Sequence, residues 1–237
     1  MKTKSATDPK AKAQMRISAR AQMRISTGKI KIAKTKTENA KTIDAKNVAL
    51  KPTIWRTARA LANDKRLNLL RLVAKSEGKV DVTRLAKEAK LPKPIASNYL
   101  RALNARGLIS VVRVKAFVYY GMESDRSLPT AIAIQKAFAR LFAQPSLPKN
   151  WTRRLIPLFK GYAHPRREKI VKILHESQPI SFEDLSQVSG IPKPSLLRHL
   201  YTLTSGGIVE HDDQRRFILA EPQDALAAAF LDALCIP

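Results

Sequence analysis

The sequence is poor in the residues that build catalytic and metal centres. It holds one cysteine, Cys235, and four histidines in 237 residues. A disulfide within the chain and a cysteine-based metal site are therefore excluded. The histidines lack the spacing of zinc ligands, and the eight glycines form no phosphate-binding loop. With no nucleophile–base pair in sight either, we predict a protein that is not an enzyme and uses no cofactor or metal ion.

Long apolar runs are missing too. No stretch approaches the ~20 apolar residues that cross a bilayer, and the first residues lack the apolar core of a secretory signal. We therefore expect a cytoplasmic protein without a membrane partner. The first residues are basic and poor in acids, so an organellar transit peptide stays open as an alternative.

Acidic residues are scarce, and the excess of positive charge is uneven. The net charge is +25 in all; residues 1–51 carry +11, residues 52–150 carry +13 and residues 151–237 carry +1. Such a field favours a polyanion, usually nucleic acid. A lysine-rich surface that only keeps the protein soluble is the alternative.

Aromatic residues are absent before Trp55. The preceding segment repeats Ala-Gln-Met-Arg-Ile-Ser at 13–18 and 21–26 and continues with closely spaced lysines. It can bury too little apolar area to offset its ordering entropy. We predict a disordered basic arm over residues 1–50 that adds salt-sensitive phosphate contacts without reading bases.

One motif occurs twice, a hundred residues apart. Leu91-Pro92-Lys93-Pro94 begins a helix-like run that ends at Gly107, and Ile191-Pro192-Lys193-Pro194 begins a similar run that ends at Gly207. A repeat of this length indicates a duplicated domain. We predict a first domain over 52–143, a linker over 144–150 and a second domain over 151–237.

Each repeat has the pattern of a helix-turn-helix followed by a hairpin. In the first, helical spacing at Trp55, Ala58 and Leu61 precedes further helices, and β-rich segments flank a loop at 114–116. Amphipathic helices follow the hairpins, over 130–142 and 223–234. We therefore predict a mainly α, α+β fold: two tandem winged-helix domains with small β-hairpin wings.

The outward face of the helix over 94–105 is the predicted DNA-reading surface. Short polar groups there can reach base edges, and cations can hold phosphates. Asn98 suits adenine, and Ile95 suits a thymine methyl. A merely solvated helix face is the alternative. The predicted contacts of this domain, with its wing at 113–117, are Lys93, Ile95, Ser97, Asn98, Arg101, Arg113 and Lys115.

The second repeat carries a weaker version of this surface. Leu197 offers no hydrogen bond to a base, and Glu210, Asp212 and Asp213 in its wing would repel phosphates. We expect this repeat to bind DNA weakly or to serve mainly in packing. Its candidate contacts are Lys193, Ser195, Arg198, Arg215 and Arg216.

The run from Ala60 to Leu67 resembles the opening of ArsR-type winged-helix repressors, and the run from Tyr162 to Arg167 is a similar copy that keeps the family's proline. The runs ending at Leu103 and Leu203 also resemble the end of the family's recognition helix. The resemblance implies a winged helix that binds double-stranded DNA. The cysteine pair and the carboxylate–histidine set of the family's metal sensors are missing, so metal sensing is not expected.

The same resemblance implies pairing through the helices that follow the wings. The family forms homodimers from one winged helix per chain, whereas this chain holds two. We therefore expect either a pseudo-two-fold monomer or a homodimer, formed through the helices over 130–142 and 223–234.

Two functions fit these features. The first is a DNA-binding transcriptional regulator, associated with the nucleoid, that uses the first repeat and the basic arm. The second is an architectural or assembly protein whose tandem winged helices bind DNA without sequence preference or bind protein partners. The pair Ser97 and Asn98 favours the first, while the arm and Leu197 favour the second.

Overall fold

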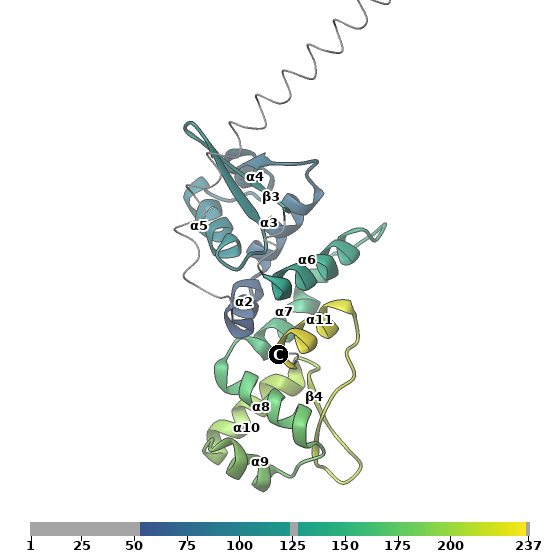
Figure 1. Ribbon diagram of the computed structural model, residues 1–237. Coiled ribbons are helices and arrows are strands. Elements are labelled where there is room, and N and C mark those ends of the chain that lie inside the picture. The colour runs from purple at the N-terminus through teal and green to yellow at the C-terminus, as the bar shows by residue number, and fades with distance from the viewer. Residues whose placement is uncertain (1–52, 124–127, 236–237) are drawn as a thin grey trace, which may run out of the picture. The chain divides into compact units, whose positions relative to one another are not determined.

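The computed structural model describes residues 53–123 and 128–235. The predicted basic arm lies outside these residues. The first repeat comprises α2 (Ile54–Leu61), α3 (Asp64–Lys75), β1 (Val80–Asp81), α4 (Val82–Glu88), α5 (Lys93–Asn104), β2 (Ser110–Val114), β3 (Phe117–Gly121) and α6 (Pro129–Phe142) (Figure 1). The second comprises α7 (Trp151–Tyr162), α8 (Pro165–Ser177), α9 (Phe182–Ser189), α10 (Lys193–Ser205), β4 (Val209–His211), β5 (Phe217–Leu219) and α11 (Ala225–Cys235). The predicted α+β winged-helix fold is confirmed.

The wings are antiparallel hairpins. In the first repeat β3 lies between β1 and β2, and Val112 faces Tyr119 in the register of the hairpin. Strand β1 is not predictable from the sequence, because a strand of two residues shows no alternation that could reveal it. In the second repeat β4 pairs with β5, and Ile180 adds an isolated bridge to Phe217.

Local capping fixes where the helices of both repeats begin. The Asn63 side chain accepts a hydrogen bond from the Arg66 backbone N–H at 3.0 Å, and His164 Nδ1 accepts one from the Arg166 N–H at 3.1 Å. These bonds satisfy N–H groups that would otherwise have no partner in the first turn. His164 is thus the N-cap of α8.

Gly107 ends the run of α5 with φ +68°. A Cβ at this position would lie 2.7 Å from Leu128 Cδ1 and 3.2 Å from Ala131 Cβ. Both the left-handed backbone and the close approach of α6 therefore require glycine.

Equivalent leucines form the centres of the two helix-turn-helix units. Leu85, Leu100 and Leu103 are fully buried in the first repeat, and Leu185, Leu200 and Leu203 are buried in the second. Of the predicted helical spacing, Ala58 and Leu61 face the core, whereas Trp55 is only partly buried. The neighbouring Ile54 begins the apolar stripe of this helix in place of Trp55.

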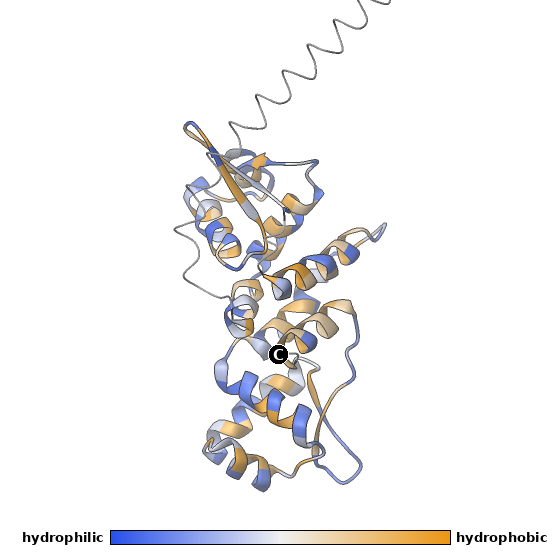
Figure 2. Ribbon diagram, in the orientation of Figure 1, coloured by the Kyte–Doolittle hydropathy of each residue, from blue (hydrophilic) through white to orange (hydrophobic). Residues whose placement is uncertain are grey.

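The two repeats pack against each other within the chain. The post-wing helices α6 and α11 are in contact, as are the lead helices α2 and α7 (Figure 1). A row of aromatic rings runs from Phe138 of α6 to Phe159 of α7 at 6.1 Å and on to Phe230 of α11 at 5.4 Å. Most of α11 is apolar (Figure 2). This row is a hydrophobic core shared by both repeats.

Within the ranges 53–123 and 128–235, no helix combines the length and apolar character needed to cross a membrane.

Candidate nucleic-acid interface

Helix α5 presents one polar face to solvent. Ala96, Leu100 and Leu103 are fully buried, so the opposite side of the helix points outward. Lys93, Asn98 and Arg101 are exposed, Ile95 is 40% exposed, and Ser97 is half-buried. The structure thus brings all five predicted contacts of this helix onto its accessible side or the edge of that side.

Arg101 and Asn98 are bonded to one another on this face. The Arg101 guanidinium donates to Asn98 Oδ1 at 2.6 Å, and its Nε donates to the Ser97 carbonyl at 3.4 Å. The amide NH₂ of Asn98 then points away from the bonded oxygen. An amide oxygen has two lone pairs, so Asn98 can accept a second hydrogen bond from a base while Arg101 stays in place.

The first wing carries its cations at the tip. Arg113 and Lys115 are exposed, and Lys115 has φ +52° in the tight turn. Among the ion pairs of the described residues none involves Lys93, Arg113 or Lys115. These cations are therefore available to phosphates without breaking an internal pair.

Phe117, on the same wing, was missed from the sequence. Its ring is 60% exposed, and the neighbouring Val114 is 51% exposed. A cavity of about 380 Å³ separates this wing from the start of α5 and is lined by Phe117, Lys93 and Ser97 among others. The sequence pattern could have revealed this exposed ring. Side chains alternate between the two faces of a β-hairpin, and an aromatic residue at the tip has no core to enter.

On α10, the equivalent helix of the second repeat, two of the equivalent positions are apolar and exposed. Leu197 is 62% exposed and Tyr201 is 75% exposed. Lys193 pairs with Glu183 at 3.4 Å, while Arg198 is exposed. Leu197 was expected to be unsuited to reading bases. Its side chain is exposed, and nothing in the described part of the chain covers it.

The second wing neutralises its own charge. Arg216 donates to Asp212 Oδ2 from Nε and from the guanidinium NH₂, both at 2.8 Å. Desolvation alone would raise the pKa of Asp212, but the hydrogen bonds and charge of Arg216 lower it. Arg215 is exposed, with φ +59°. Arg216 is thus a structural partner of Asp212, and of the two predicted contacts in this wing only Arg215 is unpaired.

Ser195 is surrounded by arginine and histidine side chains. Its hydroxyl accepts from Arg166 Nη1 at 3.2 Å and lies 3.4 Å from His199 Nε2. The His164 and His199 rings are 4.7 Å apart. Burial and, after it, the positive charges of His164, Arg167, Arg166 and Arg198 together lower the pKa of His199 to about 4. His199 is therefore neutral near pH 7, and Ser195 is held by its neighbours.

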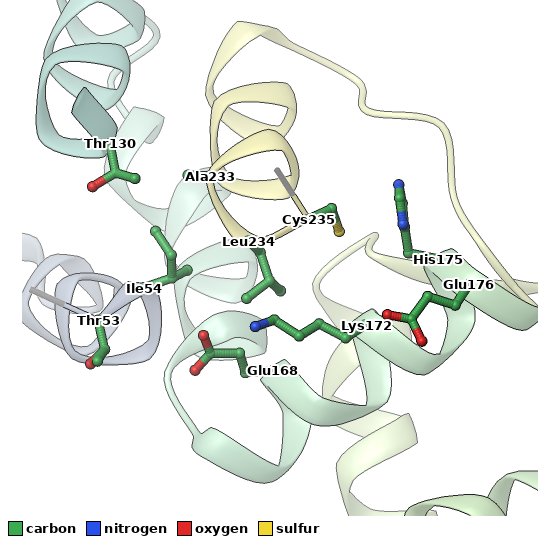
Figure 3. A pocket seen from close by; sticks show the side chains of 10 residues that line it. All are labelled: Thr53, Ile54, Thr130, Glu168, Lys172, His175, Glu176, Ala233, Leu234 and Cys235. Carbon is green, nitrogen blue, oxygen red and sulfur yellow. The ribbon is translucent and has the colours of Figure 1, made fainter. Parts of the chain in front are cut away.

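A second cavity, of about 360 Å³, has no residue of α5 in its lining; Figure 3 shows the side chains that line it. Its lining includes four residues of α8 and one of α11: Glu168, Lys172, His175, Glu176 and Cys235. Burial raises the pKa of the Glu168 carboxyl, and the nearby Lys172 charge opposes that shift. In the described part of the chain, no three His, Cys, Asp or Glu side chains are placed to hold a metal ion.

A segment of each repeat matches the sequence model of a known family. Residues 63–111 match the sequence model of the bacterial regulatory protein family arsR, and residues 169–213 match that of the IclR helix-turn-helix domain. Each repeat thus contains a segment similar to the helix-turn-helix of a known family. The predicted ArsR-type resemblance is confirmed, and the second repeat adds the likeness to IclR.

Two solved structures are similar over about half of the chain. Reduced HlyU from Vibrio cholerae is 21% identical over 47% of this chain and 98% of its own, with a TM-score of 0.30. The homodimeric winged helix-turn-helix DNA-binding domain of Mb0332 from Mycobacterium bovis, a possible ArsR-family transcriptional regulator, is 26% identical over 46% of this chain and 92% of its own, with a TM-score of 0.29. No curated protein matches the sequence.

The ArsR-type motif has a structural role in both repeats. Arg66 donates to the Arg59 carbonyl at 3.0 Å, and Arg167 donates to the Lys160 and Gly161 carbonyls at 2.6 and 2.7 Å. Each arginine thus satisfies carbonyls at the end of the preceding lead helix. The motif arginine serves the fold, which explains why it recurs in both repeats.

Proposed function

We propose that the protein is a DNA-binding transcriptional regulator that reads duplex DNA with α5 and holds the backbone with the wing at 113–117. The arm over residues 1–50 supplies further phosphate contacts. A duplex DNA target would place the protein on the nucleoid in the cytoplasm.

The unpaired charge of the first repeat carries this proposal. Lys93, Arg113 and Lys115 face solvent without an ion pair among the described residues, beside the polar pair Asn98 and Arg101. In the second repeat, by contrast, Lys193 and Arg216 have internal acidic partners. The likeness of residues 63–111 to arsR regulators supports the same assignment.

A selection from random duplexes tests the proposal. The full chain is used to enrich binding sequences, and its affinity for the enriched duplex is compared with that for a scrambled duplex at ~50 and ~200 mM salt. A regulator is expected to prefer the enriched duplex by ~10³ or more. Equal affinities that collapse together with salt would contradict it, because phosphate contacts alone behave in this way.

The exposed apolar residues of α10 favour a second candidate. A protein partner that covered Leu197 and Tyr201 would remove their apolar surface from water, which favours binding. Such a partner is expected for an architectural or assembly protein. The same selection separates the two functions, since this candidate predicts no enriched sequence.

We further propose that the chain acts as a pseudo-two-fold monomer. The contact of α6 with α11 and the shared row of Phe138, Phe159 and Phe230 support pairing within one chain. A homodimer through these helices would need that row to open.

A further inference from the structure

Positively charged residues of both repeats gather around His164, the N-cap residue of α8. Helices α2 and α8 are in contact. Burial lowers the pKa of His164, and the charges of Arg167, Arg166 and Arg59 lower it further. Arg59 belongs to the first repeat and the other two to the second, so charges from both repeats act on the same imidazole.

This cluster touches both helices of the recognition type. On one side Arg66, which donates to the Arg59 carbonyl, lies over the Tyr99 ring of α5 at 5.5 Å from its centroid. On the other side Arg166 donates to Ser195 at the start of α10. The cluster therefore reaches α5 at Tyr99 and α10 at Ser195.

The exposed members of the cluster lack an acidic partner. Arg59, Arg166 and Arg198 are exposed, whereas Arg66 and Arg167 are partly buried and bonded to backbone carbonyls. None of the ion pairs within residues 53–123 and 128–235 involves any of them. Gathering like charges without counter-charges opposes folding, and a bound polyanion relieves that repulsion.

We propose that Arg59, Arg166 and Arg198 form a site for the phosphates of duplex DNA, which extends the α5 interface toward the second repeat. The proposal rests on the proposed function and adds Arg59 and Arg166 to the predicted contacts. Guanidinium groups suit phosphates because their planar donors bind two oxygens at once. In this arrangement the second repeat contributes backbone contacts through this edge while Leu197 and Tyr201 read no bases.

A charge-matched pair of triple variants tests this site in the full chain. The first variant is Arg59→Gln, Arg166→Gln and Arg198→Gln. The control is Lys75→Gln, Lys136→Gln and Lys149→Gln, which removes the same charge from exposed positions elsewhere. Affinity for the enriched and the scrambled duplex is measured across salt concentrations, after thermal unfolding has shown that both variants fold.

The arginine variant is expected to lower the slope of log K against log salt by about 2–3, because each lost phosphate contact removes about 0.9. The ratio between the two duplexes should hardly change, and the control should keep most of the slope. A charge-keeping triple, Arg59→Lys, Arg166→Lys and Arg198→Lys, should restore most of it.

Two results overturn the site, and they are distinguishable. If the wild-type chain binds DNA and both glutamine variants behave alike, the site is refuted while the proposed function stands. If the wild-type chain binds neither duplex, the proposed function fails and the site fails with it.

Discussion

The Arg101 guanidinium donates a hydrogen bond of 2.6 Å to the side-chain oxygen of Asn98, so two of the residues that we propose as DNA contacts are already bonded to each other in the free protein. This hydrogen bond orients the Asn98 amide with its oxygen toward Arg101. The NH₂ group of the amide can then donate a hydrogen bond to a base. Arg101 thereby orients Asn98, in addition to any phosphate contact of its own.

The coupling between these residues is measurable. Asn98→Ala is expected to cost about 1–3 kcal/mol of binding to the enriched duplex, and the double variant with Arg101→Ala roughly 2–5 kcal/mol. The double loss should be smaller than the sum of the single losses, because each single variant already breaks the shared bond. Fluorescence anisotropy on the two single variants and the double variant measures this. Unchanged affinity in the double variant would remove α5 from the interface.

The two wings should differ in their contribution. Arg113→Ala with Lys115→Ala removes two unpaired cations, so binding to enriched and scrambled duplexes should weaken alike and the salt slope should fall by about 2. The control, Arg215→Ala at the tip of the second wing, should change little, since Asp212 and Asp213 offset the charge there. Comparable losses from both wings would show that the second wing also lies on DNA.

Removal of residues 1–50 is expected to flatten the salt dependence and to leave sequence preference intact. The segment brings a large excess of lysine and arginine but no base-reading pattern. Affinity of the truncated chain for the two duplexes, at several salt concentrations, gives both quantities. Loss of preference together with the arm would contradict this division of roles.

Pairing within the chain predicts a sedimentation mass of 26.5 kDa at micromolar concentration. The shared row of aromatic rings should hold both repeats together, so Phe138→Ala should lower the free energy of unfolding by about 3–5 kcal/mol. Sedimentation equilibrium and urea unfolding measure the two effects. A stable species of twice the monomer mass would argue for a homodimer instead.

The buried imidazole of His199 should make stability depend on pH. The folded pKa is about 4 and the ordinary value is 6.5, so the unfolded chain binds more protons between these values. The free energy of unfolding should fall as the pH drops from about 6.5 toward 4, by roughly 1–3 kcal/mol. His164, whose pKa is also lowered, acts in the same direction.

A matched variant isolates this effect. His199→Tyr introduces the residue that the first repeat holds at the equivalent position, Tyr99, and should remove much of the loss. Urea midpoints at pH 7.5 and pH 5.0 compare the two chains. An equal loss in both would assign the pH dependence to other groups.

Sequence periodicity was enough for the fold and for the outward face of α5. The apolar spacing around Leu100 and Leu103 determines which side of that helix is buried, and the equivalent leucines at 200 and 203 repeat the rule. Trp55 was misplaced because an apolar residue beside a true core position, Ile54, satisfies the same spacing. Helical phase at the end of an element is set by packing partners that a local pattern does not contain.

Contacts between distant residues were beyond the sequence. That Arg216 is paired with Asp212, or that Ser195 is held by Arg166, depends on side-chain geometry rather than residue type. The contact of α2 with α8 brings together segments about a hundred residues apart. Charge counts correctly distinguished the repeats, but they could not separate free cations from paired ones.

The most direct test of the account compares equivalent faces of the two repeats on one enriched duplex. Ser97→Ala, Asn98→Ala and Arg101→Ala are combined in α5; the control combines Leu197→Ala, Arg198→Ala and Tyr201→Ala in α10. Anisotropy with the enriched and scrambled duplexes should show that the α5 variant loses its preference by ~10² or more, while the α10 variant keeps it. Retention of preference by the α5 variant, with loss in the α10 variant, would place sequence recognition in the second repeat and contradict the account.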